Sequence, residues 1–313
     1  MKKPLSQKYK PSSLAEFKMD DRMRRVLMNM LKSGTMNIML TGAPGTGKSC
    51  LTNLLIQEYY KGDTKDNILV LNNLKEQGIQ YYRTDVKYFC QTTCVGRKKL
   101  IVVDDIDLVS EQNQQLFVNY VNKYPLVNFI VAGTNTQKII DGVQSRLVAF
   151  RLNALEQADL MDLIERVSAG EGITIDDSAK EIVLSISNGS VRMLIHNLEK
   201  FKLLGKNVTR DVVDATCTCI RFTVLSEYTD AVLAQQFHKA SKMMYAIYCE
   251  GYSGIDILDN YFLFLKVSRI QDAVKYEFVK VLCKYIAVFN QLHEHHVELL
   301  FFTLDLCNAA RED

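Results

Sequence analysis

Residues 42–49 read GAPGTGKS, which fits the phosphate-binding pattern G-x-x-x-x-G-K-[ST]. The apolar residues 38–40 (IML) come directly before this stretch, and a helical-looking segment, 50–60, follows it. In such a strand–loop–helix setting the glycines let successive backbone N–H groups turn around a polyphosphate, and the helix N-terminus adds partial positive charge. The stretch therefore predicts an ATP or GTP site. The alternative is a glycine-rich turn before an ordinary helix.

Each residue of this loop has an expected part in holding a polyphosphate. Lys48 can reach the β- and γ-phosphates, and the Ser49 hydroxyl can ligate Mg²⁺. We expect nucleotide contacts from the whole loop and from the next helical residue: Gly42, Ala43, Pro44, Gly45, Thr46, Gly47, Lys48, Ser49 and Cys50.

The composition is that of an ordinary globular protein. The chain has 313 residues, of which 48% are hydrophobic and 24% charged, so two or three domains with buried cores are expected. A net charge of +2 means that any contact with DNA must come from a local patch. Eight cysteines, without a secretory leader or a membrane-length apolar run, predict a soluble protein of a reducing intracellular compartment that makes no membrane contact.

The pattern of apolar runs changes near residue 153. Before it, short runs at 37–41, 67–72, 99–104, 127–133 and 148–152 alternate with helical stretches such as 111–124, which predicts a parallel sheet covered by helices. After it, helical periodicity dominates, with helices expected at 156–169, 176–187, 190–204 and 209–217. We therefore predict an α/β nucleotide-binding domain (1–153), a small helical domain (154–220) and an all-helical C-terminal domain (221–313).

An aliphatic run at 100–103 ends in two carboxylates, Asp104 and Asp105. A buried strand that delivers an aspartate beside a phosphate loop is how such sheets support Mg²⁺, so we expect Asp104 to hold the metal through a bound water. Asp105 lies where a base can polarise the attacking water. For Asp107, capping a short helix after the strand is as good an interpretation as a role in the nucleotide site.

Polar residues follow the strand expected at 127–133. Thr134 and Asn135 come at the carboxyl edge of the sheet, where open α/β sheets hold their ligands, so either residue can sense a γ-phosphate or hold the water. Arg146 follows a short helix and would point away from its own nucleotide, which suits donation to the phosphate of a neighbouring subunit. Arg192 opens a helix of the second domain, where a surface arginine is the simplest reading.

Together these stretches resemble the AAA+ ATPases, and specifically the small subunits of replication factor C, the sliding-clamp loader, from residue 8 to about residue 258. Residues 8–11 (KYKP) are similar to the family's K-Y-R-P, residues 42–49 to G-P-P-G-T-G-K-[ST] and residues 72–78 to N-A-S-D-E-R-G. Residues 104–107 replace D-E-A-D, residues 144–146 match the Q-S-R of the S-R-C motif, and residues 189–192 match G-D-x-R. Residues 251–258 (GYSGIDIL) resemble the start of the family's collar domain.

This resemblance implies an AAA+ parallel-sheet domain followed by a small helical lid and an all-helical collar that joins subunits. It implies that Tyr9 and Pro11 lie near the adenine, that Arg146 acts in trans and that Arg192 is a second sensor of the γ-phosphate. In an ungapped alignment Thr134 takes the place of the first sensor, and Asn135 is the alternative.

A helix that lines the DNA chamber in the family corresponds to residues 81–87. Arg83 and Lys87 are four residues apart on one helix face, so they are the expected contacts to DNA phosphates. A solvated basic face is the alternative reading.

Two departures from the family pattern bear on function. The glutamate of D-E-A-D is Asp105 here, one methylene shorter, so the site either hydrolyses ATP slowly or mainly binds it. The basic pair of the family's A-L-R-R-x-M-E helix is missing at 116–122, and the clamp-facing segment 90–97 is short, which leaves open whether this subunit touches the clamp.

The leading hypothesis is an ATPase: a small subunit of a heteropentameric clamp loader that binds ATP and Mg²⁺ and helps to load a ring-shaped sliding clamp onto primer–template DNA during replication. Its partners would be the other clamp-loader subunits, the clamp and the DNA backbone. The alternatives are an ATP-binding but non-hydrolysing scaffold subunit of the same complex, and a hexameric DNA motor of the branch-migration type. The expected location is the nucleus in a eukaryote and the cytoplasm otherwise.

Overall fold

The computed structural model describes residues 3–61, 67–71, 79–92, 98–205, 207–217, 220–268, 270–291 and 295–310. The chain forms two compact units, one of Met1–Leu160 with Gly189–His196 and one of Met161–Asn188 with Asn197–Asp313. The structure separates into these two units, and the three domains expected from the sequence stay a prediction. The N-A-S-D-E-R-G-like stretch, 72–78, and most of the clamp-facing segment, 93–97, lie outside the described residues.

The first unit is built on a five-stranded sheet in the order β2-β3-β4-β1-β5, with every neighbouring pair parallel. The strands are β1 (Ile38–Gly42), β2 (Ile68–Leu71), β3 (Lys99–Val103), β4 (Val127–Gly133) and β5 (Val148–Leu152). β1 pairs with two strands, so Ile38 lies between Ile130 of β4 and Val148 of β5. The α/β fold class predicted from the sequence is confirmed.

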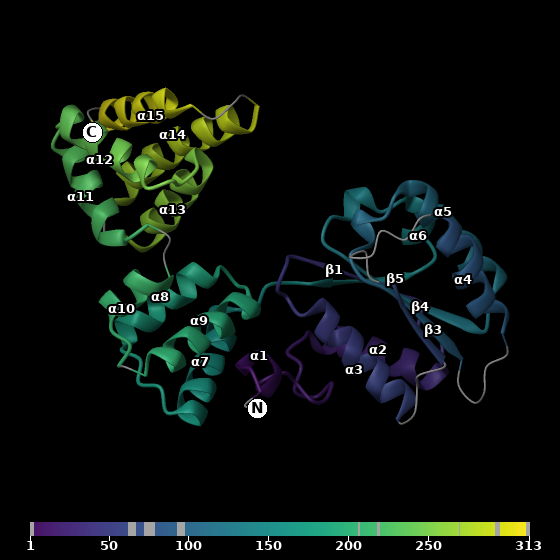
Figure 1. Cartoon of the computed structure of the whole chain (residues 1–313). Helices are drawn as coiled ribbons and strands as arrows, with labels where there is room; N and C mark the ends of the chain where they lie inside the picture. The colour runs from purple at the N-terminus through teal and green to yellow at the C-terminus, as the bar shows by residue number, and fades with distance from the viewer. Residues whose placement is uncertain are drawn as a thin grey trace. The chain divides into compact units, whose positions relative to one another are not determined.

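Helices cover both faces of this sheet, α2 and α3 on one face and α4, α5 and α6 on the other (Figure 1). The described helices of this part of the chain are α1 (Leu5–Lys8), α2 (Asp21–Ser33), α3 (Lys48–Tyr60), α4 (Ile79–Gln91), α5 (Glu111–Lys123) and α6 (Asp141–Gln144), and its described 3₁₀ turns include η2 (Ile106–Leu108) and η3 (Thr136–Lys138).

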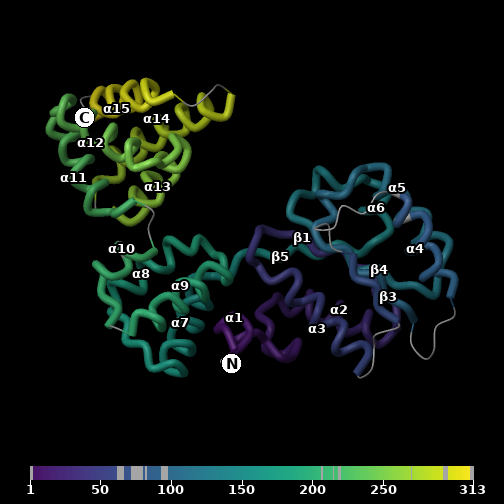
Figure 2. Tube along the Cα trace, viewed as in Figure 1, coloured from purple at the N-terminus to yellow at the C-terminus, as the bar shows by residue number. Residues whose placement is uncertain are grey.

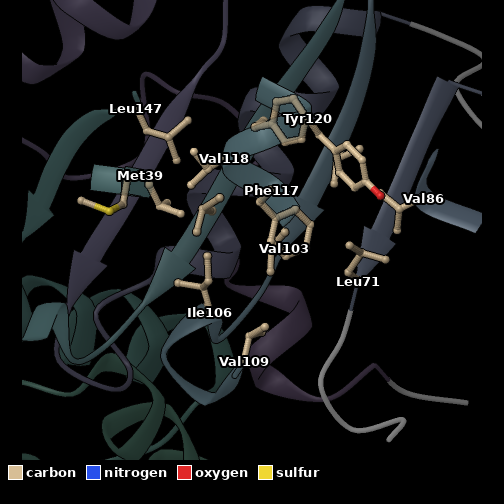
Figure 3. Packing of buried hydrophobic residues seen from close by; sticks show 14 of the residues in the cluster. Met39, Leu71, Val86, Val103, Ile106, Val109, Phe117, Val118, Tyr120 and Leu147 are labelled. Atoms are coloured by element: carbon tan, nitrogen blue, oxygen red, sulfur yellow. The ribbon is translucent and has the colours of Figure 1, made fainter. Parts of the chain in front are cut away.

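The strands are apolar on both faces because both faces are buried. Alternate residues of a strand point to opposite sides, so Met39 packs with Phe117 and Val118 of α5 in one cluster (Figure 3), while Leu40 packs with Leu51 of α3 in the other. Each such side chain contributes about 1.5–3 kcal/mol when it is fully buried. This core fixes where the strands end, and therefore where the polar residues after them lie.

A buried glutamine ties together the turns that follow β3 and β4. Gln114 of α5 has no exposed surface. Its Nε2 lies 2.9 Å from the carbonyl oxygens of Val109 and Lys138 and 3.3 Å from that of Ile106, and its Oε1 accepts the Ile140 N–H at 2.9 Å. One side chain thus satisfies backbone groups of η2, of η3 and of the segment that leads to α6.

Beyond β5 the chain is helical to residue 309 in its described parts, apart from an isolated parallel bridge between Ile175 and Val208 (Figure 2). The four helices expected up to residue 217 each begin one residue later than the sequence pattern indicates, because that pattern counts N-cap residues such as Asp176, whose backbone is extended. The helices are α7 (Gln157–Glu171), α8 (Asp177–Ser187), α9 (Val191–Leu204), α10 (Arg210–Cys217), α11 (Phe222–Leu233), α12 (Phe237–Cys249), α13 (Gly254–Val267), α14 (Asp272–Gln291) and α15 (His296–Ala309).

Among the described helices, none has both the length and the apolar character needed to cross a membrane.

Gln114→Ala should lower the free energy of unfolding by about 3–5 kcal/mol, because it opens a cavity and strips buried backbone groups of their partners. Gln115, its exposed neighbour on the same helix, is the matched control, and Gln115→Ala should cost less than about 0.5 kcal/mol. Urea unfolding of the three proteins measures both changes. Equal stability of the two variants would contradict the role assigned to the buried amide.

Candidate functional site

The loop between β1 and α3 leaves no room for side chains at two of its glycines. A Cβ added at Gly42 would lie 2.4 Å from the carbonyl oxygen of Leu152, and one added at Gly45 would lie 2.2 Å from Ser190 Oγ. Gly45 (φ 81°) and Gly47 (φ 98°) also have left-handed backbone, which favours glycine. The loop is therefore enclosed by the end of β5 and by the residues before α9.

Lys48 is only 8% exposed, although it carries the loop's positive charge. Its Nζ donates to the carbonyl oxygens of Gly42 at 2.8 Å and Ala43 at 3.1 Å, so the ammonium lies inside the loop. Burial lowers the pKa of Lys48, and the attraction of Asp105, Asp104 and Asp107 opposes that shift without cancelling it. The three aspartates compensate the buried positive charge of Lys48 only in part, and a polyphosphate bound in the loop would supply further negative charge.

Asp104 and Ser49 bring two oxygens together beside the loop. The Ser49 hydroxyl donates to Asp104 Oδ2 at 3.0 Å. A hydroxyl and one carboxylate are the hard oxygen ligands that Mg²⁺ uses when nucleotide phosphates complete its shell. No group of three or more His, Cys, Asp or Glu side chains that could hold a metal occurs in the part of the chain that the structure describes. The pair fits a magnesium ion that is shared with phosphates, and does not fit a self-sufficient metal centre.

Asp105 turns the chain at the end of β3. Its φ of 49° is left-handed, which is uncommon for a residue with a side chain, and it is the N-cap residue of η2. Partial removal from water raises the pKa of its carboxyl, and the nearby charges of Asp104 and Asp107 raise it further. A raised pKa is the direction that a general base needs.

Asp107 does not cap the turn in which it lies, so the capping role read from the sequence is wrong for this residue. Its Oδ2 accepts the Thr134 hydroxyl at 2.6 Å and the Asn135 backbone N–H at 3.1 Å. Burial raises the pKa of Asp107, but the hydrogen bonds from Thr134 and Asn135 outweigh burial and hold the pKa below its ordinary value. The carboxylate links the turn after β3 to the turn after β4.

Arg192 lies at the second position of α9, next to the phosphate loop. Its Cβ is 3.6 Å from the place where a Cβ of Gly45 would lie. Its charge also acts on the pKa values of Lys48 and Asp105. The structure thus brings the expected second sensor to the same edge as Lys48, and the guanidinium is exposed and available to an anion.

The N-terminal segment meets the loop through Phe17, a residue that the sequence analysis did not single out. Tyr9 is the C-cap residue of α1 and is half-buried, as is Pro11. The ring of Phe17 lies 3.1 Å from the place where a Cβ of Gly47 would lie. Behind the loop, Cys50 is half-buried, and burial raises the pKa of its thiol. An apolar residue just before a helix carries no signal that it will cover a phosphate loop.

A cavity of about 430 Å³ lies between the loop and the ends of β4 and β5. Its wall holds one cationic side chain, Arg151, which the sequence pattern reads only as part of a strand. Thr41 and Thr134 contribute hydroxyl groups to the same wall. The full lining is Thr41, Gly42, Ala43, Thr134, Thr136, Arg151, Leu152, Asn153 and Ala154.

Arg146 lies at the opposite edge of the sheet. It precedes β5 by two residues, and β5 runs from Val148 beside Ile38 to Leu152 beside Gly42. The start of β5 and the start of the phosphate loop are therefore separated by roughly 13 Å of strand. The exposed guanidinium donates to Asn122 Oδ1 at 2.8 Å, to the Gly142 carbonyl at 2.9 Å and to Ser145 Oγ at 3.3 Å. This cation is held rigidly, but away from its own loop.

Arg83 and Lys87 are both exposed on α4, four residues apart. The structure therefore keeps them on one helix face, as the sequence indicates. Neither contributes to the loop, so any role for them concerns a different partner.

A five-stranded parallel sheet with a phosphate loop after β1, acidic residues after β3 and polar residues after β4 defines an AAA+ ATPase. A family model described as AAA domain matches residues 35–158, and one described as Replication factor C C-terminal domain matches residues 222–285. The chain belongs to the family of replication factor C small subunits, because a curated member is 30% identical to it over 257 residues, 80% of this chain and 79% of that one. The resemblance drawn from the sequence motifs is confirmed.

That relative is the replication factor C small subunit of Thermofilum pendens. Replication factor C small subunit 1 of Pyrobaculum islandicum is 28% identical over 311 residues, which cover 98% of this chain and 94% of the relative. Among solved structures, the RuvB Holliday junction branch migration motor of Thermotoga maritima aligns with a TM-score of 0.51 at 18% identity, over 65% of this chain and 70% of that one. At that identity the structural match shows the shared fold alone.

Gly45→Ala should weaken nucleotide binding about ten-fold or more, a loss of about 1.4 kcal/mol, because the added methyl collides with Ser190. Gly251 is the matched control: it has φ 98°, but a Cβ there meets nothing within 4 Å. Gly251→Ala should lower the free energy of unfolding by about 1–2 kcal/mol, because alanine disfavours left-handed backbone, and should leave the nucleotide affinity unchanged. Equilibrium titration with a fluorescent ATP analogue measures the affinities, and equal affinity in the two variants would rule out the steric argument.

Proposed function

We propose that this chain is an ATP-hydrolysing small subunit of a heteropentameric clamp loader. In this proposal, ATP held between neighbouring subunits keeps them in an arrangement that opens a ring-shaped clamp and grips primer–template DNA, and hydrolysis releases the clamp. Membership in the replication factor C small-subunit family supports a clamp-loader function and the ATPase activity of an AAA+ protein, and it does not favour a hexameric DNA motor.

The loop and its neighbours supply the groups that ATP hydrolysis needs. Lys48 would bind the β- and γ-phosphates, and Ser49 with Asp104 would hold Mg²⁺. The magnesium ion would neutralise phosphate charge when bound. Asp105 would take a proton from the attacking water, which its raised pKa favours. Arg192, with Thr134 or Asn135, would distinguish a nucleotide that still carries its γ-phosphate.

Arg146 is the observation that carries the proposal of an assembly. Its hydrogen-bond partners, Asn122, Gly142 and Ser145, are neutral acceptors, so none of them offsets the positive charge of the guanidinium. It is exposed and at the amino edge of the sheet, whereas the chain's own loop is at the carboxyl edge. A cation held in this way suits the phosphates of a second subunit, where such an arginine lowers the barrier to phosphoryl transfer.

In the complex assembled with its native partner chains, Arg146→Ala should lower ATP turnover at the neighbouring site by about 10³-fold while the ATP affinity of this chain's own loop stays unchanged. Arg166, an exposed arginine of α7, is the control, and Arg166→Ala should keep the turnover. Steady-state ATPase assays give the rate, and native mass spectrometry gives the subunit number. Full turnover by an isolated chain, or a hexameric mass, would refute the assembly.

Arg83 and Lys87 are the proposed contacts to the DNA backbone. Replacing both with alanine should make primer–template binding by the complex less salt-dependent, with the slope of log K against log salt falling by about 2. Lys123→Ala, at an exposed lysine of α5, is the control and should leave the slope unchanged. Fluorescence anisotropy at a series of salt concentrations measures it; an unaltered slope in the double variant would mean that this face of α4 is only solvated.

A further inference from the structure

The hydrogen bonds at the carboxyl edge of β3 and β4 give Thr134 and Asn135 different chemical polarities. Asp107 Oδ2 accepts from both residues, from the Thr134 hydroxyl at 2.6 Å and from the Asn135 backbone N–H at 3.1 Å. An ionised carboxylate can only accept hydrogen bonds, so the hydroxyl proton in the shorter contact belongs to Thr134.

This leaves the two residues with opposite capacities toward a ligand. A hydroxyl has a single proton, and Thr134 has committed its proton to Asp107, so its oxygen can only accept from a ligand. Asn135 Oδ1 accepts the Gln137 backbone N–H at 2.9 Å, which orients the side-chain amide and leaves its Nδ2 as the donor. A phosphate oxygen needs a donor, whereas a water that is about to attack needs an acceptor.

One oxygen of Asp107 has no donor within the described part of the chain, although the hydrogen bonds to the carboxylate stabilise its ionised form overall. Its Oδ1 is buried, and no donor among the described residues reaches it. A Cβ added at Gly133 would lie 3.2 Å from that oxygen, so the glycine at the end of β4 makes room for the carboxylate. A buried acceptor without a donor costs free energy that an apolar contact between the same two turns would not. The carboxylate thus joins the two turns through Oδ2 and leaves Oδ1 unpaired among the described residues.

We propose that Asp107 is a positioning residue that fixes the Thr134 hydroxyl as the acceptor for the attacking water and leaves donation to the γ-phosphate to the Asn135 amide. This rests on the proposed function, since it assigns tasks within the same ATP site. It favours Asn135 over Thr134 as the residue that senses the γ-phosphate.

The first test needs no hydrolysis and uses the full-length chain with Mg²⁺. The affinities for ADP and for a non-hydrolysable ATP analogue are measured by calorimetry, and their ratio reports recognition of the γ-phosphate. Asn135→Ala should lower the preference for the ATP analogue about ten-fold, the effect of one lost hydrogen bond to a charged group, with ADP affinity unchanged. Thr134→Val, which keeps the shape but removes the hydroxyl, should leave the ratio unchanged. The reverse pattern would overturn the assignment.

The second test is a double-mutant cycle on single-turnover hydrolysis in the assembled complex. Thr134→Val and Asp107→Ala should each slow hydrolysis about ten-fold or more, because the water loses its orienting acceptor. If Asp107 acts through Thr134, the double variant should be no slower than the slower single variant. Thr134→Ser, which restores the hydroxyl, should recover most of the rate. Effects that multiply, or a Thr134→Val variant with the normal rate, would overturn the proposal.

Asp177→Ala is the matched control, because this exposed aspartate pairs with Lys180 in α8, outside the loop region. It should change neither the nucleotide ratio nor the rate. If the wild-type complex hydrolyses no ATP, the hydrolytic part of the proposed function fails, while the nucleotide ratio still decides the tasks of Thr134 and Asn135. If the complex hydrolyses ATP and the cycle is additive, only the role of Asp107 fails.

Discussion

The shared direction of the five buried strands is the constraint on which the site depends. Because every neighbouring pair is parallel, the turns that follow β1, β3, β4 and β5 meet at one edge of the sheet. The phosphate loop follows β1, the acidic residues follow β3, and the expected sensor residues Thr134 and Asn135 follow β4. Reversing any one strand would carry its polar residues to the other edge, so the chemistry follows from the topology rather than from any single contact.

Crowding at that edge shifts the pKa values of Lys48, Asp105 and Asp107. Burial outweighs the attraction of three aspartates at Lys48, so the pKa of the lysine falls despite its anionic neighbours. Among the acids, partial burial and nearby like charges raise the pKa of Asp105, whereas hydrogen bonds lower the pKa of Asp107. Titratable neighbours whose pKa values are pushed apart can take different tasks. The pKa of Asp105, the expected base, is shifted upward, whereas Asp107, whose pKa is shifted downward, joins the two adjoining turns.

The sequence predicts the fold well because its signals are local. Short apolar runs mark all five strands, and the glycines with Lys48 and Ser49 mark the loop. It predicts less about the side chains that connect the turns. Gln114 reads as one more polar residue of an amphipathic helix, and its burial depends on backbone groups of two other turns. From the sequence, Asp107 is interpreted as a helix cap, because the Thr134 hydroxyl that donates a hydrogen bond to it is 27 residues away in the chain. Such contacts depend on tertiary register, which periodicity does not encode.

The two edges of the sheet carry different functional groups. At the carboxyl edge lie Lys48, Ser49 and Asp104, whereas at the amino edge Arg146 is exposed and held by neutral partners. Asn122 is important here, because it holds Arg146 with an amide oxygen at 2.8 Å. A carboxylate in its place would form an ion pair and cancel much of the charge that a phosphate is to meet. An uncharged acceptor fixes the direction of the guanidinium and leaves its charge for an anion outside the chain. Arg146 lies a strand's length from its own loop, so in the proposed assembly it would reach a phosphate only on a second copy of the fold placed edge to edge with this one.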